Sequence, residues 1–72
     1  MKKRYKIEVE CANCANKMEA AANKVDGVRH AAVNFILQTI TVDIADERDA
    51  QEVMSAVLRA CKKIEPDCTI SY

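Results

Sequence analysis

The sequence has 72 residues, of which 50% are hydrophobic and 31% are charged, a composition that fits one small folded domain (residues 1–72) and excludes a disordered chain. The 11 Lys and Arg residues balance the 11 Asp and Glu residues, so the basic excess that nucleic-acid binding usually requires is absent. No apolar run is long enough to span a bilayer, no signal-peptide pattern opens the chain, and we expect a soluble cytoplasmic monomer.

The first half of the chain shows a strand pattern, a helix pattern and a second strand pattern. Residues 4–9 alternate apolar and polar side chains, which predicts a strand with one buried face. Apolar residues at helical spacing predict a helix from about Cys14 to Val25. Gly27, the only glycine, suits the left-handed conformation that often ends a helix. A strand over residues 28–36 should follow.

The second half begins with a predicted hairpin, in which a short link at residues 37–38 leads to a strand over residues 39–44. Alternation in that strand places its isoleucines and valine on one face. A helix is predicted over residues 48–62, with Asp46 or Asp49 as its N-terminal cap.

A last strand is predicted over residues 67–72, because Pro66 prevents the helix from continuing. The resulting order, βαββαβ, is that of the split-βαβ or ferredoxin-like fold, an α+β sandwich. A four-stranded antiparallel sheet would carry both helices on one face. Chain direction then places the hairpin at 36–39 and the connection at 62–66 at the same end as the loop after the first strand.

That first loop contains the most informative motif, Cys11-Ala12-Asn13-Cys14, at the junction between strand and helix. A helix N-terminus carries unpaired N–H groups and partial positive charge, which favours thiolate over thiol. The thiolate is the form that binds metals or attacks disulfides. Glu10 directly precedes the first cysteine and offers a carboxylate oxygen beside two sulfurs.

These three side chains, Glu10, Cys11 and Cys14, form a candidate metal site. Two thiolates alone suit Cu(I), whereas Zn(II) and Cd(II) prefer about four ligands and accept carboxylate oxygen beside sulfur. The three residues would leave a position open for a water molecule or for a partner's ligand. An open coordination shell is what transfer of the metal to another site requires. The alternative for Glu10 is a solvated loop carboxylate.

Two further interpretations concern the cysteines. A CxxC motif at a strand-to-helix junction also occurs in thiol–disulfide oxidoreductases of the thioredoxin type, although those chains are longer and usually carry a proline in or near the active-site helix. Cys61 and Cys68 fit apolar faces, so we predict that they pack in the core as small hydrophobic residues. The alternative is a role as additional ligand, chiefly for Cys61, which closes the second helix.

With these residues in place, the chain resembles a heavy-metal-associated domain over nearly its whole length. The resemblance rests on the Cys11–Ala15 motif, on Gly27-Val28, on Val33-Asn34-Phe35 and on the βαββαβ order. Residues 62–67 resemble the end of such domains in zinc, cadmium and lead exporters. The family commonly has Gly-Met and a small polar residue before the first cysteine, where this chain has Glu8-Val9-Glu10. The acidic residue at that place is similar to the divalent-metal exporters.

The resemblance implies a function in metal transfer rather than in catalysis. The domain would bind Zn(II), Cd(II) or Pb(II) and pass it by ligand exchange to another metal-binding domain or to the transport site of an ATPase. Its implied context is the cytosolic N-terminus of a metal-exporting P-type ATPase. The alternative within the same fold is a Cu(I) metallochaperone or a domain of a copper ATPase.

Overall fold

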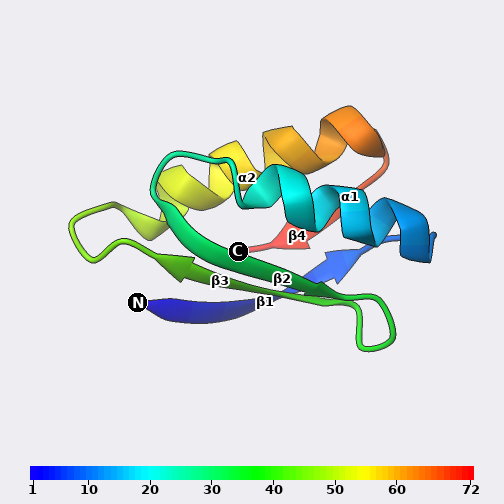
Figure 1. Ribbon diagram of the computed structural model, residues 1–72, viewed down its shortest axis with the longest axis horizontal. Coiled ribbons are helices and arrows are strands. Elements are labelled where there is room, and N and C mark those ends of the chain that lie inside the picture. The colour runs from blue at the N-terminus through cyan, green and yellow to red at the C-terminus, as the bar shows by residue number, and fades with distance from the viewer.

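The computed structural model describes residues 1–72, which form six elements. In chain order these are β1 (Lys2–Glu8), α1 (Ala12–Ala22), β2 (Val28–Asn34), β3 (Thr39–Ile44), α2 (Ala50–Ile64) and β4 (Thr69–Ser71). The strands form one sheet in the order β2-β3-β1-β4, and every neighbouring pair is antiparallel. Both helices cover the same face of this sheet (Figure 1). The predicted ferredoxin-like βαββαβ sandwich is therefore confirmed.

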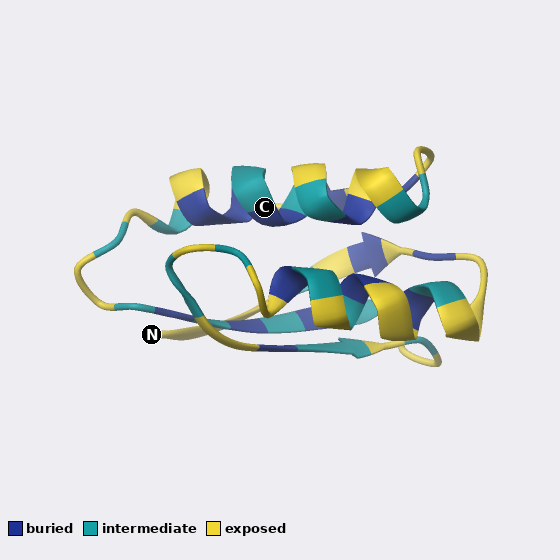
Figure 2. Ribbon diagram, turned by 45° about the horizontal axis from the view of Figure 1, so that its top comes forward, coloured by how far each residue is buried: buried dark blue, intermediate teal, exposed yellow.

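The core lies between the helices and the sheet, and it contains no polar or charged residue. Buried and exposed residues alternate along the strands and follow one side of each helix (Figure 2). The fully buried side chains include Cys61 and Cys68 beside those of Ile7, Met18, Ile40, Val42, Ile44, Val53, Met54 and Val57. Because the interior is apolar, any ion-binding chemistry of this chain must lie at its surface.

Neither helix has the length and hydropathy that crossing a lipid bilayer requires.

Helix α1 begins two residues earlier and ends three residues earlier than the sequence predicts. Cys11 has an extended backbone, and its carbonyl accepts the first helical hydrogen bond from the Ala15 N–H at 2.9 Å, so Cys14 lies inside the first turn. At the other end Asn23 caps the helix in a right-handed conformation. Gly27 does have a positive φ, 95°, but it lies in the following turn. Its predicted role as the helix cap is therefore wrong.

Side chains of α1 hold that helix against the exposed edge of β2. The Asn23 amide donates to the Ala31 carbonyl at 2.8 Å and accepts from the Ala31 N–H at 2.9 Å. Glu19 accepts from the Val33 N–H at 2.8 Å. These bonds satisfy backbone groups of an edge strand that would otherwise be open to pairing. They also fix the helix that carries Cys14.

The remaining boundaries differ modestly from the prediction. The β2–β3 link comprises residues 35–38 rather than two residues, and Gln38 adopts a positive φ of 53°. Strand β4 is shorter than the predicted residues 67–72. Asp49 caps α2 as predicted, since its carboxylate accepts from the Gln51 N–H at 3.2 Å.

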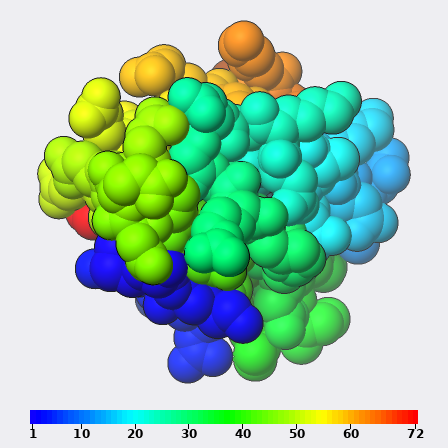
Figure 3. All heavy atoms as spheres, turned by 60° about the vertical axis from the view of Figure 1, so that its left-hand side comes forward, coloured from blue at the N-terminus to red at the C-terminus, as the bar shows by residue number.

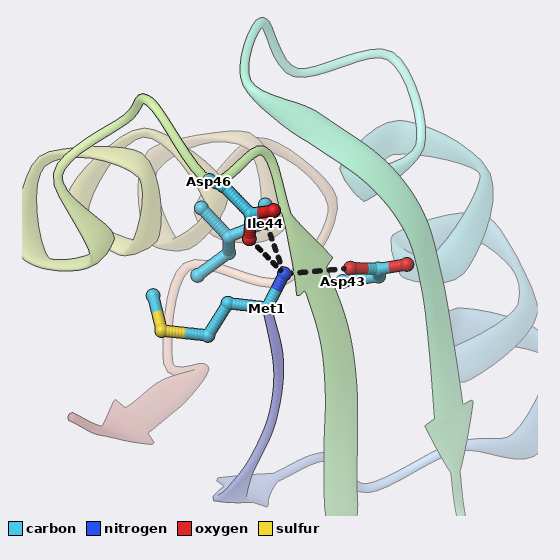
Figure 4. Close-up of polar contacts among 4 residues, drawn as sticks. All are labelled: Met1, Asp43, Ile44 and Asp46. Atoms are coloured by element: carbon cyan, nitrogen blue, oxygen red, sulfur yellow. Dashed lines mark hydrogen bonds and ion pairs between the residues drawn. The ribbon is translucent and has the colours of Figure 1, made fainter.

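Asp46, the other candidate cap, instead binds the N-terminal amine. The Met1 ammonium donates to Asp46 Oδ1 at 2.9 Å, to Asp43 Oδ1 at 3.2 Å and to the Ile44 carbonyl at 2.7 Å (Figure 4). The N-terminal residues accordingly lie against the start of the β3–α2 connection (Figure 3). This contact joins β1 to β3 at the end of the molecule opposite Cys11.

We predict that this contact makes stability depend on pH. The hydrogen bond to Asp46 is the main cause that raises the pKa of the Met1 amine above its ordinary value of 8.0. A group with a raised pKa stabilises the fold fully below its unfolded pKa and loses that contribution as the pH rises through the folded pKa. The free-amine chain should therefore be more stable than an N-acetylated chain near neutral pH, and the difference should shrink in alkaline solution. Urea unfolding of both chains at about pH 7 and about pH 10 measures this; an equal difference at both pH values would contradict it.

Candidate metal centre

The CxxC motif lies at the junction between β1 and α1, as the sequence predicts. Cys11 is exposed and immediately precedes the helix, whereas Cys14 is half-buried and packs against the core. The prediction that both thiols lie on the loop is wrong for Cys14, because the helix begins at Ala12. The site is thus built from one loop cysteine and one helical cysteine.

At the N-terminus of α1 the pKa values of the two thiols shift in opposite directions. The pKa of Cys11 is lowered, first by the nearby backbone N–H of Cys14, then by the Cys14 thiol and the Asn13 N–H. The pKa of Cys14 is raised, first by the neighbouring Cys11 thiol and further by burial. The expected preference for thiolate therefore holds for Cys11 but not for Cys14. In the metal-free chain Cys14 is therefore the harder of the two thiols to deprotonate, and a bound cation would displace its proton.

Glu65 is a neighbour of this pair that the sequence reasoning missed as a candidate ligand. Its negative charge is a minor cause that raises the pKa of both Cys11 and Cys14, so its carboxylate lies at the same end of the molecule, although it does not form a ready three-ligand group with them. Atom Oε2 of Glu65 is buried and has no hydrogen-bond partner. The predicted position of the 62–66 connection at the cysteine end is thereby confirmed. The sequence signal that could have identified Glu65 is an acidic residue in a connection that was predicted to lie at the cysteine end.

Glu10 occupies an exposed bend between β1 and Cys11. Its carboxylate forms no hydrogen bond or ion pair, and no three His, Cys, Asp or Glu side chains are arranged as ready metal ligands. The chain therefore holds its dithiol in place but does not preassemble a third ligand. Glu10 as a ligand stays a prediction.

Cys61 and Cys68 form a separate pair in the core. Both side chains are fully buried, and the two thiols lie close enough for each to affect the pKa of the other. Burial raises the pKa of Cys61 to about 12, and burial likewise raises that of Cys68. The predicted core positions are confirmed, and thiols of this kind are poor metal ligands because they resist deprotonation.

We expect Cys61→Ala and Cys68→Ala to leave metal affinity nearly unchanged and to lower stability. Each removes a small, fully buried side chain from the core, a loss on the order of 1 kcal/mol. Chemical unfolding and metal titration of the two single variants measure both effects. A tenfold fall in affinity for Cys61→Ala would make that residue a ligand.

Comparison with known proteins places these features in a family. A family model described as heavy-metal-associated domain matches residues 4–65. A cadmium, zinc and cobalt-transporting ATPase of Bacillus subtilis is 35% identical over 71 residues, which cover 97% of this chain and 10% of the ATPase. A copper-exporting P-type ATPase of the same organism is 49% identical over 43 residues, covering 58% of this chain and 5% of that protein.

A solved structure agrees with both the sequence and the fold. The Cu(I)-loaded N-terminal domain of a potential copper-translocating P-type ATPase from Bacillus subtilis has a TM-score of 0.74 and 34% identity. The match covers 97% of this chain and 82% of that domain. The chain thus spans nearly all of a single domain but a tenth or less of the two ATPases it matches.

Proposed function

Because this chain belongs to the heavy-metal-associated domain family, we propose that it binds one soft divalent metal ion and passes it to a partner by ligand exchange. Zn(II) and Cd(II) are the proposed cargo, and Pb(II) belongs to the same class. Cys11 and Cys14 would supply two thiolates. Glu10, Glu65 or both would add carboxylate oxygen.

The dithiol supports cargo transfer rather than permanent storage. Cys11 is exposed and has the lower pKa of the two thiols, so an incoming ion would be captured there first. Cys14 would then lose its proton as it joins the coordination shell. A partner's thiolate or carboxylate can then enter the open side of the shell, since structural sites are closed by four ligands and this one is not. No covalent bond of a substrate changes, so the domain acts as a carrier and not as an enzyme.

The observation that carries the choice of a divalent ion is the buried Glu65 Oε2, which has no hydrogen-bond partner and belongs to a carboxylate whose charge acts on both cysteines. A buried carboxylate oxygen without a partner is costly, and a second anion near two thiolates adds repulsion. A divalent cation relieves both penalties and accepts oxygen ligands. Cu(I), with one charge and a preference for soft ligands, gains less from the same carboxylate.

Cu(I) is the second candidate, and specific similarities favour it. The copper-exporting relative has the higher identity, although over a shorter stretch, and the solved domain described above is loaded with Cu(I). Two thiolates suffice for that ion. A thiol–disulfide oxidoreductase, the third interpretation, has only the position of the CxxC motif in its favour, and the family match supports metal binding instead.

The proposed context is the metal-binding N-terminal domain of an exporting P-type ATPase, in the cytosol. Its partners would be another metal-binding domain or the transport site itself. The match to the cadmium, zinc and cobalt transporter over 97% of the chain supports this context.

Competitive titration tests the choice of metal. The reduced chain is titrated with Zn(II), Cd(II) and Cu(I) against chelators of known affinity, and Cd(II) and Cu(I) binding is followed by thiolate-to-metal absorption. We expect one Zn(II) or Cd(II) per chain, held tightly enough to compete with the chelator. Binding of Cu(I) alone would assign the domain to copper, and binding of none of the three would overturn the proposal.

A further inference from the structure

Gln38 makes contacts that no other residue of the β2–β3 link makes. Its backbone carbonyl accepts from the Ile7 N–H at 3.1 Å. Its side-chain Oε1 accepts from the Val9 N–H at 2.9 Å, and its side-chain Nε2 donates to the Phe35 carbonyl at 2.8 Å. One residue therefore binds the N–H groups of both Ile7 and Val9 in the segment that leads to Cys11.

These bonds continue the pairing of β1 with β3 past the point where β3 begins. The last paired residues are Lys6 and Thr39. The backbone of Gln38 supplies the next bond, to Ile7, and its side chain supplies the one after that, to Val9. The side-chain amide thus takes the place of a strand residue where the chain has already turned away.

Val9 is the last fixed residue before the candidate ligands. It is buried, with 4% exposure, and Glu10 and Cys11 follow it directly. On the far side of Cys11 the first hydrogen bond of α1 fixes the backbone. Without Gln38 Oε1, the Val9 N–H would be left in the protein interior with no partner, which is unfavourable.

The backbone of Gln38 supports a specialised role. Its φ of 53° makes it the only non-glycine residue in the left-handed region. Asparagine, aspartate and glycine adopt this conformation more readily. A glutamine there reaches the Val9 N–H, which a glycine or the shorter asparagine side chain would not.

We infer that Gln38 is a positioning residue of the metal site: through Val9 it sets where Glu10 and Cys11 lie relative to Cys14. This rests on the proposed function, and it assigns part of the metal affinity to a residue that has no ligand atom on the metal. Outer-shell partners that orient ligands change metal affinity by about 10–100-fold when they are removed.

The decisive variant is Gln38→Asn, which keeps an amide and tolerates the positive φ but is one methylene too short to reach Val9. We expect it to weaken Cd(II) binding at least about tenfold and to remove the hydrogen-exchange protection of the Val9 amide. Gln38→Glu retains an oxygen of the right reach for the Val9 N–H but loses the donor to the Phe35 carbonyl, so it should restore the Val9 protection and the Cd(II) affinity only in part. Leu37→Ala, in the same turn and 63% exposed, should change neither.

A control separates positioning from general destabilisation. Gly27→Ala places a methyl group 2.8 Å from Val53 Cγ2 at a positive φ, so it should destabilise the fold far from the metal site. If Gly27→Ala lowers Cd(II) affinity as much as Gln38→Asn at equal loss of stability, the effect of Gln38 is only structural and the inference is wrong. It is also wrong if Gln38→Asn loses the Val9 protection but keeps full affinity.

The exchange measurement needs no metal, which keeps the inference distinct from the proposed function. A wild-type chain that binds neither Zn(II) nor Cd(II) refutes the proposed divalent-metal function. Persistent protection of Val9 in metal-free Gln38→Asn would refute the positioning contact itself.

Discussion

Replacing Cys11 and Cys14 together by serine should abolish tight binding of Zn(II) and Cd(II) while the chain stays folded. The two thiolates provide most of the affinity, and their removal leaves only carboxylate oxygen from Glu10 and Glu65. The fold should persist because Cys11 is exposed and Cys14 is only half-buried. Serine is also a preferred residue at the N-cap position that Cys11 occupies. Metal titration and circular dichroism of the double variant measure the two outcomes.

The matched control is the double variant Cys61→Ser with Cys68→Ser, which removes the same number of thiols from the core. It should lose stability, since it buries hydroxyl groups in an apolar interior, and the folded fraction should still bind metal. Stoichiometric tight binding by the Cys11 and Cys14 double variant would show that the cargo ligands lie elsewhere.

Metal affinity of the wild-type chain should also rise with pH as the Cys14 thiol becomes easier to deprotonate. The raised pKa of Cys14 means that binding must displace its proton, and metal binding that releases protons strengthens as the pH increases. Affinities of different variants are therefore comparable only at one pH.

The fold was predictable from the sequence because its periodic patterns are strong. Alternation in β3 and the apolar face of α2 both specify which side chains are buried, and one core can satisfy them all. The order of elements then determined which loops meet at the cysteine end. Element boundaries were less predictable, because they depend on contacts between distant residues. The end of α1 is determined by Asn23 bonding to the neighbouring strand at Ala31, a contact with no local sequence signal.

The two cysteines of the candidate site were predictable from the sequence, whereas some of the residues around them were not. A CxxC motif carries its own geometry, since a helix that begins beside it brings both sulfurs together. Glu65 is distant from that motif in sequence, and only tertiary packing of the α2–β4 connection brings its charge close enough to affect the two cysteines. Gln38 has no local sequence signal either, because its role depends on the hydrogen bond that its side chain accepts from the distant Val9 N–H.

Selectivity should depend on the carboxylates, and Glu10→Ala tests the one that the sequence predicts. Zn(II) and Cd(II) would lose a charged oxygen ligand, and loss of a direct ligand should cost at least the ~10–100-fold that outer-shell changes cost. Cu(I) affinity should hold or rise, because the two sulfurs satisfy that ion and one negative charge near them is removed. The titrations must be made on reduced chains at one pH.

Two companion variants make this result specific. Glu65→Gln keeps the shape of the side chain and removes the charge whose oxygen is buried without a partner, so it reports the contribution of the second carboxylate to the same selectivity. Glu47→Ala removes an exposed carboxylate from the β3–α2 connection, at the opposite end of the molecule, and should leave all affinities unchanged. If Glu10→Ala lowers Zn(II) and Cu(I) affinity by the same factor, Glu10 is not a selective ligand. If Glu65→Gln alone then weakens Zn(II) selectively, the divalent site uses Glu65 as its oxygen ligand; if neither variant does, the copper assignment gains equal standing.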